Sequence, residues 1–158
     1  MGKPSTSTLM TAGNEVAMIF TSNYKIAGHL PQAVAISLGV PRGWQGRRCK
    51  ALAPPRDLIK IMEPEKFIPL YQAQVLDRLD PMQVIREMGG DNFILCCWEP
   101  PGEFCHRRVV AAWLRKRTGM LVEEFNPTKR GHTEWLRSLQ APKPYEPIDE
   151  TIPDGPDG

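Results

Sequence analysis

The chain has few of the features that place a protein in a membrane or outside the cell. No apolar run approaches the roughly 18–20 residues that a helix needs to cross a bilayer, so we expect no membrane partner. Residues 1–6 carry one lysine and precede no hydrophobic region, which is unlike a secretory signal. We therefore expect a cytoplasmic protein whose four cysteines stay reduced, as thiols or metal ligands rather than disulfides.

Strong net charge and the common phosphate-binding motifs are also absent. The formal net charge of +2 is too small to indicate a polyanion partner by itself. The chain contains no Gly-x-Gly-x-x-Gly or Walker loop. A Cys-x5-Arg phosphatase loop is excluded, because Cys97 and Arg107 are ten residues apart. Basic residues do concentrate in segments 42–50 and 107–117, which are either solvated faces or an anion-facing surface.

Composition divides the chain into one domain and two tails. Residues 1–13 are small and polar, and we predict a disordered N-terminal tail. Residues 141–158 are rich in proline and acidic residues, which predicts a loose C-terminal tail. The remaining segment, 14–140, is long enough to bury a core of its own and is predicted to be a single domain.

Within that domain, apolar runs alternate with helical patterns. The continuously apolar run 92–98 is typical of a strand buried on both faces of a parallel sheet. With helix 104–117 and strand 120–125 it predicts a βαβ unit with parallel strands. The predicted fold class is α/β, a single domain with a mainly parallel sheet and helices on both faces. Further strands are expected at 16–21 and 33–38, and helices at 67–79, 82–88 and near 134–139, with Asp80 as an N-cap.

Chemically reactive side chains collect where strand 92–98 leads into helix 104–117. In open α/β sheets, ligands bind beyond the carboxyl ends of the strands. Alternation along the strand places Cys97 and Glu99 on the same side. Cys105, His106 and Arg107 occupy the first turn of the helix, whose free N–H groups attract anions. We therefore predict one crevice lined by two thiols, a carboxylate, an imidazole and a guanidinium.

Each of these residues also has a structural interpretation. Cys96 is best explained as a small core residue, and His106 could serve packing alone. Glu99 could be solvated or could cap the next helix. Arg107 and Arg108 oppose the helix dipole, and a local rule broken without structural gain favours function. If Arg107 holds an anion, its replacement by alanine should weaken binding while changing stability by less than about 0.5 kcal/mol, as for a surface residue.

Three kinds of chemistry fit this site. The first is a thiolate nucleophile, with Cys105 favoured because His106 and Arg107 adjoin it, and with Cys97 as a resolving thiol. The second is a zinc site of Cys97, Cys105 and His106, but this spacing is a weak signal, and we predict no metal and no cofactor. The third is a pocket that binds an anion without catalysis.

The substrate class is suggested by arginines around the crevice. Arg107 and Arg108 at the helix start, and Arg42 before the basic loop 43–48, are predicted to bind substrate. The loop is either a solvated turn or a contact to a nucleotide or nucleic acid. We predict an enzyme acting on a phosphate-bearing substrate, nucleotide or nucleic acid, with a non-catalytic binding module for the same ligands as the alternative.

The Cys97-Trp98-Glu99 and Cys105-His106-Arg107-Arg108 segments resemble the domain-of-unknown-function family numbered 488. That family has a strand ending in Cys-x-Glu, followed after a short loop by a helix beginning Cys-His-Arg. The surrounding hydrophobic pattern is similar from about residue 24 to residue 124, although Ala35-Ile36-Ser37 replaces the Asp-Val-Arg frequent in the family. The resemblance implies the α/β fold and the Cys-Glu-Cys-His-Arg site, and it implies no particular reaction.

Overall fold

The computed structural model describes residues 18–90 and 92–139, in which five strands form one sheet. The strand order is β3-β2-β4-β1-β5, and every neighbouring pair in the described residues is parallel. The predicted parallel sheet is therefore confirmed. The strands are β1 (Ile19–Asn23), β2 (Ala33–Ala35), β3 (Arg47–Arg48), β4 (Phe93–Cys97) and β5 (Val122–Glu124).

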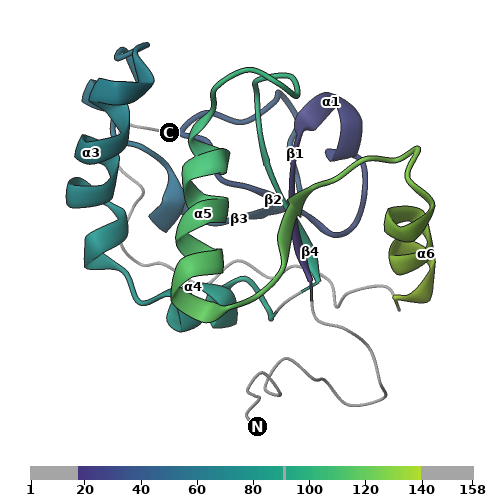
Figure 1. Ribbon diagram of the computed structural model, residues 1–158. Helices are drawn as coiled ribbons and strands as arrows, with labels where there is room; N and C mark the ends of the chain where they lie inside the picture. Colours follow the sequence, from purple (N-terminus) through teal and green to yellow (C-terminus); the bar gives the residue numbers. More distant parts are fainter. Residues whose placement is uncertain (1–17, 91, 140–158) are drawn as a thin grey trace, which may run out of the picture.

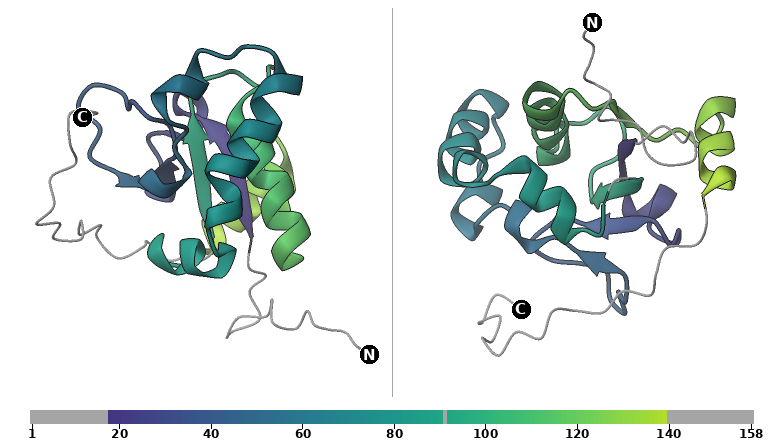
Figure 2. Two further views of the ribbon diagram at one scale, coloured as in Figure 1. Left: turned by 90° about the vertical axis from the view of Figure 1, so that its left-hand side faces the viewer. Right: turned by 90° about the horizontal axis from the view of Figure 1, so that it is seen from below.

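Helices cover both faces of this sheet, as predicted (Figures 1 and 2). Helices α3, α4 and α5 pack on one face, while α1 and α6 lie on the other. No helix in the described ranges is both long and apolar enough to span a bilayer. The helices are α1 (Tyr24–Ala27), α2 (Arg56–Ile59), α3 (Pro64–Gln74), α4 (Pro81–Glu87), α5 (His106–Thr118) and α6 (Arg130–Ser138), with 3-10 turns η2 (Lys50–Leu52) and η3 (Leu76–Arg78).

Strand β4 lies at the centre of the sheet and supplies both cores. Phe93, Leu95 and Cys97 belong to the core under α3, α4 and α5, whereas Ile94 and Cys96 belong to the core under α1 and α6. This division follows from the two-residue period of a strand, and it confirms the predicted alternation. Cys96 is accordingly a core residue on the face opposite to Cys97.

Helix α5 follows β4 and returns the chain to β5, which lies two strands away from β4 in the sheet. Strand β5 runs in the same direction as β4, as predicted, but β1 lies between them and pairs with both. Helix α5 ends at Gly119, whose φ of 76° is a left-handed conformation that glycine adopts without steric cost. The carboxyl ends of β1, β4 and β5 therefore meet at the edge where α5 begins.

Several predicted boundaries differ from the structure. The predicted helix 67–79 corresponds to α3, which begins earlier and ends at Gln74, with η3 after it. Asp80 caps α4 as predicted, since its side chain accepts a hydrogen bond from the Met82 amide at 3.1 Å. Strand β2 is shorter than predicted, and part of the 43–48 loop forms strand β3 beside it. The predicted tails, 1–13 and 141–158, lie outside the described residues.

Candidate functional site

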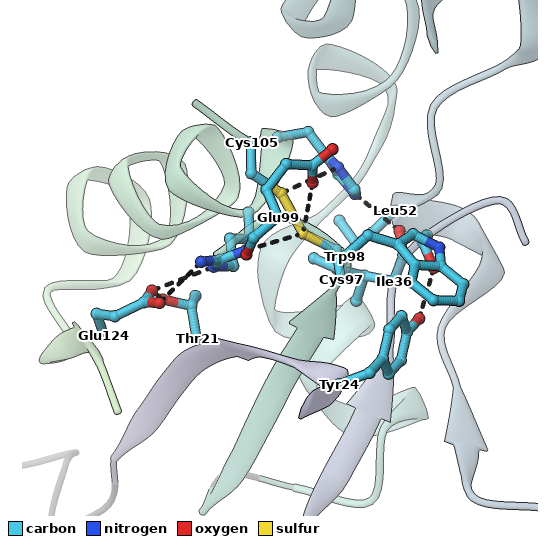
Figure 3. Close-up of a disulfide and its surroundings, with 12 residues drawn as sticks. Thr21, Tyr24, Ile36, Leu52, Cys97, Trp98, Glu99, Cys105 and Glu124 are labelled. Carbon is cyan, nitrogen blue, oxygen red and sulfur yellow. Dashed lines mark hydrogen bonds and ion pairs between the residues drawn. A yellow bond between two sulfur atoms is a disulfide. The ribbon is translucent and has the colours of Figure 1, made fainter. Parts of the chain in front are cut away.

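Cys97 and Cys105 lie together at the carboxyl edge of the sheet, where they form a disulfide (Figure 3). Cys97 is the last residue of β4, and Cys105 is the N-cap residue of α5. Their exposed fractions are 1% and 3%, so the disulfide is buried. The expectation that all four cysteines are unpaired is wrong for this pair. It holds for Cys49 and Cys96, which are free and buried.

Arg107 is buried rather than exposed, with an exposed fraction of 1%. Its Nη2 donates to Glu124 Oε2 at 2.8 Å, and its Nε donates to Glu124 Oε1 at 3.2 Å. The hydroxyl of Thr21 donates to the same carboxylate at 2.6 Å. This two-point ion pair is the structural gain that offsets the unfavourable position of Arg107 at a helix start. The expectation that Arg107 behaves as a surface residue is therefore wrong.

The third guanidinium nitrogen, Nη1, connects this ion pair to the sulfur site, that is, the Cys97–Cys105 disulfide. Nη1 of Arg107 donates to the Glu99 carbonyl oxygen at 2.8 Å and lies 3.2 Å from Cys97 Sγ. The positive charge thus faces Cys97, although Arg107 is closer to Cys105 in the sequence. An adjacent guanidinium stabilises a thiolate, so one of the two reasons for preferring Cys105 as the reactive thiol applies to Cys97 instead.

Glu99 adds a carboxylate to the same sulfur. Its side chain is half-buried, and its Oε1 lies 3.6 Å from Cys97 Sγ. A carboxylate at this position can accept the proton of a Cys97 thiol, while the guanidinium stabilises the sulfur anion that remains. The structure therefore brings together Cys97, Glu99 and Arg107, all three of which were predicted at the site.

His106 directly follows Cys105 and is also buried. Its Nε2 is 2.8 Å from the Ile36 carbonyl oxygen, which only accepts, so the proton is on Nε2. Nδ1 therefore presents a lone pair to Cys105 Sγ, 3.9 Å away. Burial, opposed by the hydrogen bond to Ile36 and assisted by the positive charge of Arg107, lowers the pKa of His106 to about 4. His106 is thus neutral at pH 7, and its Nδ1 lone pair is available to a cation.

The two free thiols show the effect of burial on a cysteine pKa where the more distant charged groups, Arg107 and Glu124 for Cys96 and Glu87 for Cys49, contribute less than burial does. Burial raises the pKa of Cys96 to about 12, and it raises the pKa of Cys49 to about 11. Both are therefore protonated at neutral pH. Cys97 differs from them in having the Arg107 guanidinium 3.2 Å from its sulfur.

Arg108 and Arg42, the other two predicted substrate-binding residues, are exposed. Arg42 precedes Trp44, whose ring contacts Tyr24 at a centroid distance of 5.2 Å. Tyr24 in turn contacts Trp98 at 4.8 Å, and Trp98, directly after Cys97, is half-exposed at 52% (Figure 3). Aromatic side chains thus adjoin the sulfur site, on the side of the sheet opposite to α5.

Glu124 was not predicted as a site residue, and neither were Thr21 and the Ile36 carbonyl group. Glu124 is the principal partner of Arg107, and it sits on β5 at the same edge of the sheet. A signal for it existed, because an acidic residue at the end of a predicted parallel strand faces the same edge as Arg107. No sequence pattern could have identified the Ile36 carbonyl group, since every residue carries a backbone carbonyl.

One group of side chains in the described ranges has the spacing of a metal site. The ligand atoms of Cys97, Cys105 and His106 all lie within 4.8 Å of one another. All three residues are buried. Two sulfurs and an imidazole nitrogen form a donor set suited to zinc and other thiophilic ions, once the sulfurs are reduced.

Comparisons of the chain with protein-family models, with curated proteins and with solved structures gave no match. The resemblance to the domain-of-unknown-function family numbered 488 therefore stays a prediction.

Proposed function

We propose that the protein is a cysteine-dependent enzyme in which the Cys97–Cys105 disulfide is reversibly reduced and Cys97 is the reactive thiolate. The observation that carries this proposal is the contact of the buried Arg107 guanidinium with Cys97 Sγ at 3.2 Å. A buried positive charge beside a sulfur stabilises the anionic form more strongly than an exposed one, because solvent screens it less. Glu99 is placed to accept the proton.

The roles of the two cysteines in this proposal follow from their neighbours. When a thiolate attacks the disulfide at Cys105, the electron pair of the S–S bond passes to Cys97, whose anion Arg107 stabilises. A second external thiol completes the reduction and leaves as part of a new disulfide. Cys105, beside the neutral Nδ1 of His106, then carries the resolving thiol. These roles reverse the assignment that the sequence favoured.

Alkylation after reduction tests this proposal. At pH 5 to 9, in the presence of a chelator, iodoacetamide should modify Cys97 faster than Cys105, with a midpoint below the ordinary thiol pKa of about 8.5. Glu99→Gln should lower the midpoint further, because it removes a negative charge near the sulfur. Mass spectrometry assigns each modified site.

Cys96 is the internal control in this experiment, since it adjoins Cys97 on the same strand and burial raises the pKa of its thiol. It should stay unmodified across the range while the protein is folded. Faster modification of Cys105 would restore the assignment favoured by the sequence. Two inert sulfurs at the site would contradict the enzyme proposal and favour a binding module.

Phosphate-bearing compounds, nucleotides or nucleic acids, are the substrate class that we propose. Because Glu124 engages Arg107, the anion would be bound by Arg108 at the start of α5 and by Arg42 after β2, both exposed. Guanidinium groups bind phosphate through paired hydrogen bonds, and their exposure leaves room for a ligand. Arg107 then acts on Cys97 rather than on the phosphate.

A thermal-shift screen of nucleotides and sugar phosphates tests this substrate class. A ligand at 100 times its dissociation constant should stabilise the protein by about 2.7 kcal/mol. The double variant Arg42→Ala/Arg108→Ala should lose most of this shift. Arg117→Ala is the matched control, because Arg117 is an exposed arginine on the same helix, about 14 Å further along it. If Arg117→Ala lost as much of the thermal shift, the ligands would be held only by nonspecific electrostatic attraction to basic residues.

A non-catalytic module for nucleotides or nucleic acids is the second candidate function. The observation that favours it is the half-exposed ring of Trp98 beside Tyr24 and Trp44. Aromatic rings of this kind stack against bases without sequence preference. Ligand binding that is independent of the redox state of Cys97 and Cys105 would support this function over the enzyme.

A further inference from the structure

The buried ring of His106, beside the Cys97–Cys105 disulfide, is oriented in a way that the proposed thiol chemistry does not require. Nδ1 of His106 carries a lone pair and lies 3.9 Å from Cys105 Sγ, which has no proton to donate while the disulfide is intact. Its orientation is set from the far side, where Nε2–H donates to the Ile36 carbonyl oxygen at 2.8 Å. An imidazole whose second nitrogen donates to a backbone carbonyl is the usual arrangement of a metal-binding histidine.

We propose that reduction turns Cys97 and Cys105, together with Nδ1 of His106, into a binding site for one thiophilic divalent cation, with Zn²⁺ as the ion of choice. This inference rests on the reversible dithiol state proposed above and adds a ligand to it. Each sulfur gains an electron on reduction, and each thiol proton is released when the cation binds.

The dimensions of the cluster suit a tetrahedral ion. Zinc binds sulfur at about 2.3 Å and nitrogen at about 2.0 Å, which places two ligand atoms about 3.5 to 3.8 Å apart. Nδ1 of His106 already lies 3.9 Å from Cys105 Sγ, and all three ligand atoms lie within 4.8 Å of one another. Two thiols that no longer share a bond separate to van der Waals contact, which is close to the spacing that the ion requires.

The surrounding charges are compatible with a bound cation. Two thiolates neutralise the ion, and the neutral imidazole adds no charge. Arg107 is positive, but its charge is paired with Glu124, and its Nη1–H is placed to donate to the Cys97 thiolate. Hydrogen bonds of this kind to a ligand sulfur commonly orient metal-bound cysteines. Three protein ligands leave the fourth tetrahedral position to water or substrate, as in catalytic rather than structural zinc sites.

The experiment compares the oxidised and reduced forms of the same polypeptide. A phosphine reductant takes up oxygen from water and delivers two electrons and two protons to the disulfide. After its removal under anaerobic conditions, the reduced protein should bind one equivalent of Zn²⁺, and the oxidised protein should bind none. Co²⁺ used as a probe should give the sulfur-to-metal charge-transfer and visible absorption of a tetrahedral thiolate site. If reduction unfolds the protein, zinc should restore its circular dichroism spectrum.

Two variants separate this site from other binding. His106→Gln should weaken the binding of Zn²⁺ at least about tenfold and change the Co²⁺ spectrum, because one ligand is lost. Cys96→Ala is the matched control, since Cys96 adjoins Cys97 but packs in the opposite core, and it should bind zinc as the unaltered protein does. Equal zinc affinity of the oxidised and reduced forms would overturn the inference. So would the absence of zinc binding after reduction, or unchanged binding by His106→Gln.

The outcome is independent of the test of the enzyme proposal, which uses alkylation in the presence of a chelator. Fast alkylation of Cys97 with no zinc binding would overturn the metal site alone. Zinc binding with an inert Cys97 would overturn the thiolate enzyme alone. If the thiolate enzyme and the metal site are both correct, Zn²⁺ should protect Cys97 and Cys105 from iodoacetamide.

Discussion

Replacing Arg107 by methionine should lower the free energy of unfolding by about 3 kcal/mol, the range expected when one partner of a buried ion pair is removed. Methionine fills part of the volume but leaves the Glu124 carboxylate without its two-point partner and the Glu99 carbonyl without its donor. Because Glu124 is 35% exposed, water offsets part of the loss, which keeps the expected value at the low end. Urea unfolding of the oxidised proteins measures the difference.

The neighbouring arginine provides the control for this measurement. Arg108→Met changes an exposed side chain on the same helical turn, and it should alter stability by less than about 0.5 kcal/mol. In the double variant Arg107→Met/Glu124→Gln, part of the lost stability should return, since no unpaired carboxylate remains. Equal stabilities of the Arg107 and Arg108 variants would show that the ion pair contributes nothing, and that Arg107 is free to bind a ligand.

Acidification should destabilise the protein by roughly 3 kcal/mol through His106 alone. In the unfolded chain this imidazole takes up a proton near pH 6.5, whereas in the folded protein its pKa is about 4. Between these values the unfolded state binds more protons, so stability is full above pH 6.5 and falls as the pH falls to about 4. The cause is burial, which penalises the charged imidazolium.

Unfolding free energies measured from pH 8 to pH 4 test this expectation. His106→Gln, whose amide can still donate to the Ile36 carbonyl, should show a shallower loss of stability over the same range. His29→Gln is the control, because His29 is an exposed histidine, and its replacement should leave the steep acid dependence in place. If His106→Gln retains the full acid dependence, another group is responsible for it.

The fold and the clustering of the candidate site residues were predictable from the sequence because both depend on local pattern. The apolar run before Trp98 identifies a central strand, and its two-residue period separates Cys97 from Cys96. The placement of Cys105 at the start of a helix follows from the loop and helix pattern after that strand, although the structure makes it the N-cap residue rather than part of the first turn. Since parallel strands present their carboxyl ends at one edge, Cys97 and the start of α5 were expected to meet there.

Pairing and direction of side chains were decided by the tertiary structure. Arg107 has a long side chain with many rotamers, and its partner is on β5, two strands away from β4 with β1 between them. Strand order is a long-range property, which is why a residue predicted at the surface is buried and why its charge faces Cys97. The disulfide likewise depends on the distance between two sulfurs, which sequence spacing does not contain.

The sequence by itself therefore determined the residue types at the site, the elements that carry them and the edge of the sheet at which they meet. These follow from local periodicity and from the handedness of parallel connections, which act over a few tens of residues. Only the tertiary structure decided which sulfur faces Arg107 and which nitrogen of His106 is free, because Glu124 on β5 and the Ile36 carbonyl just after β2 come from other parts of the sheet. The chemistry of the site depends on those contacts, since charge and proton positions are set by neighbours in space.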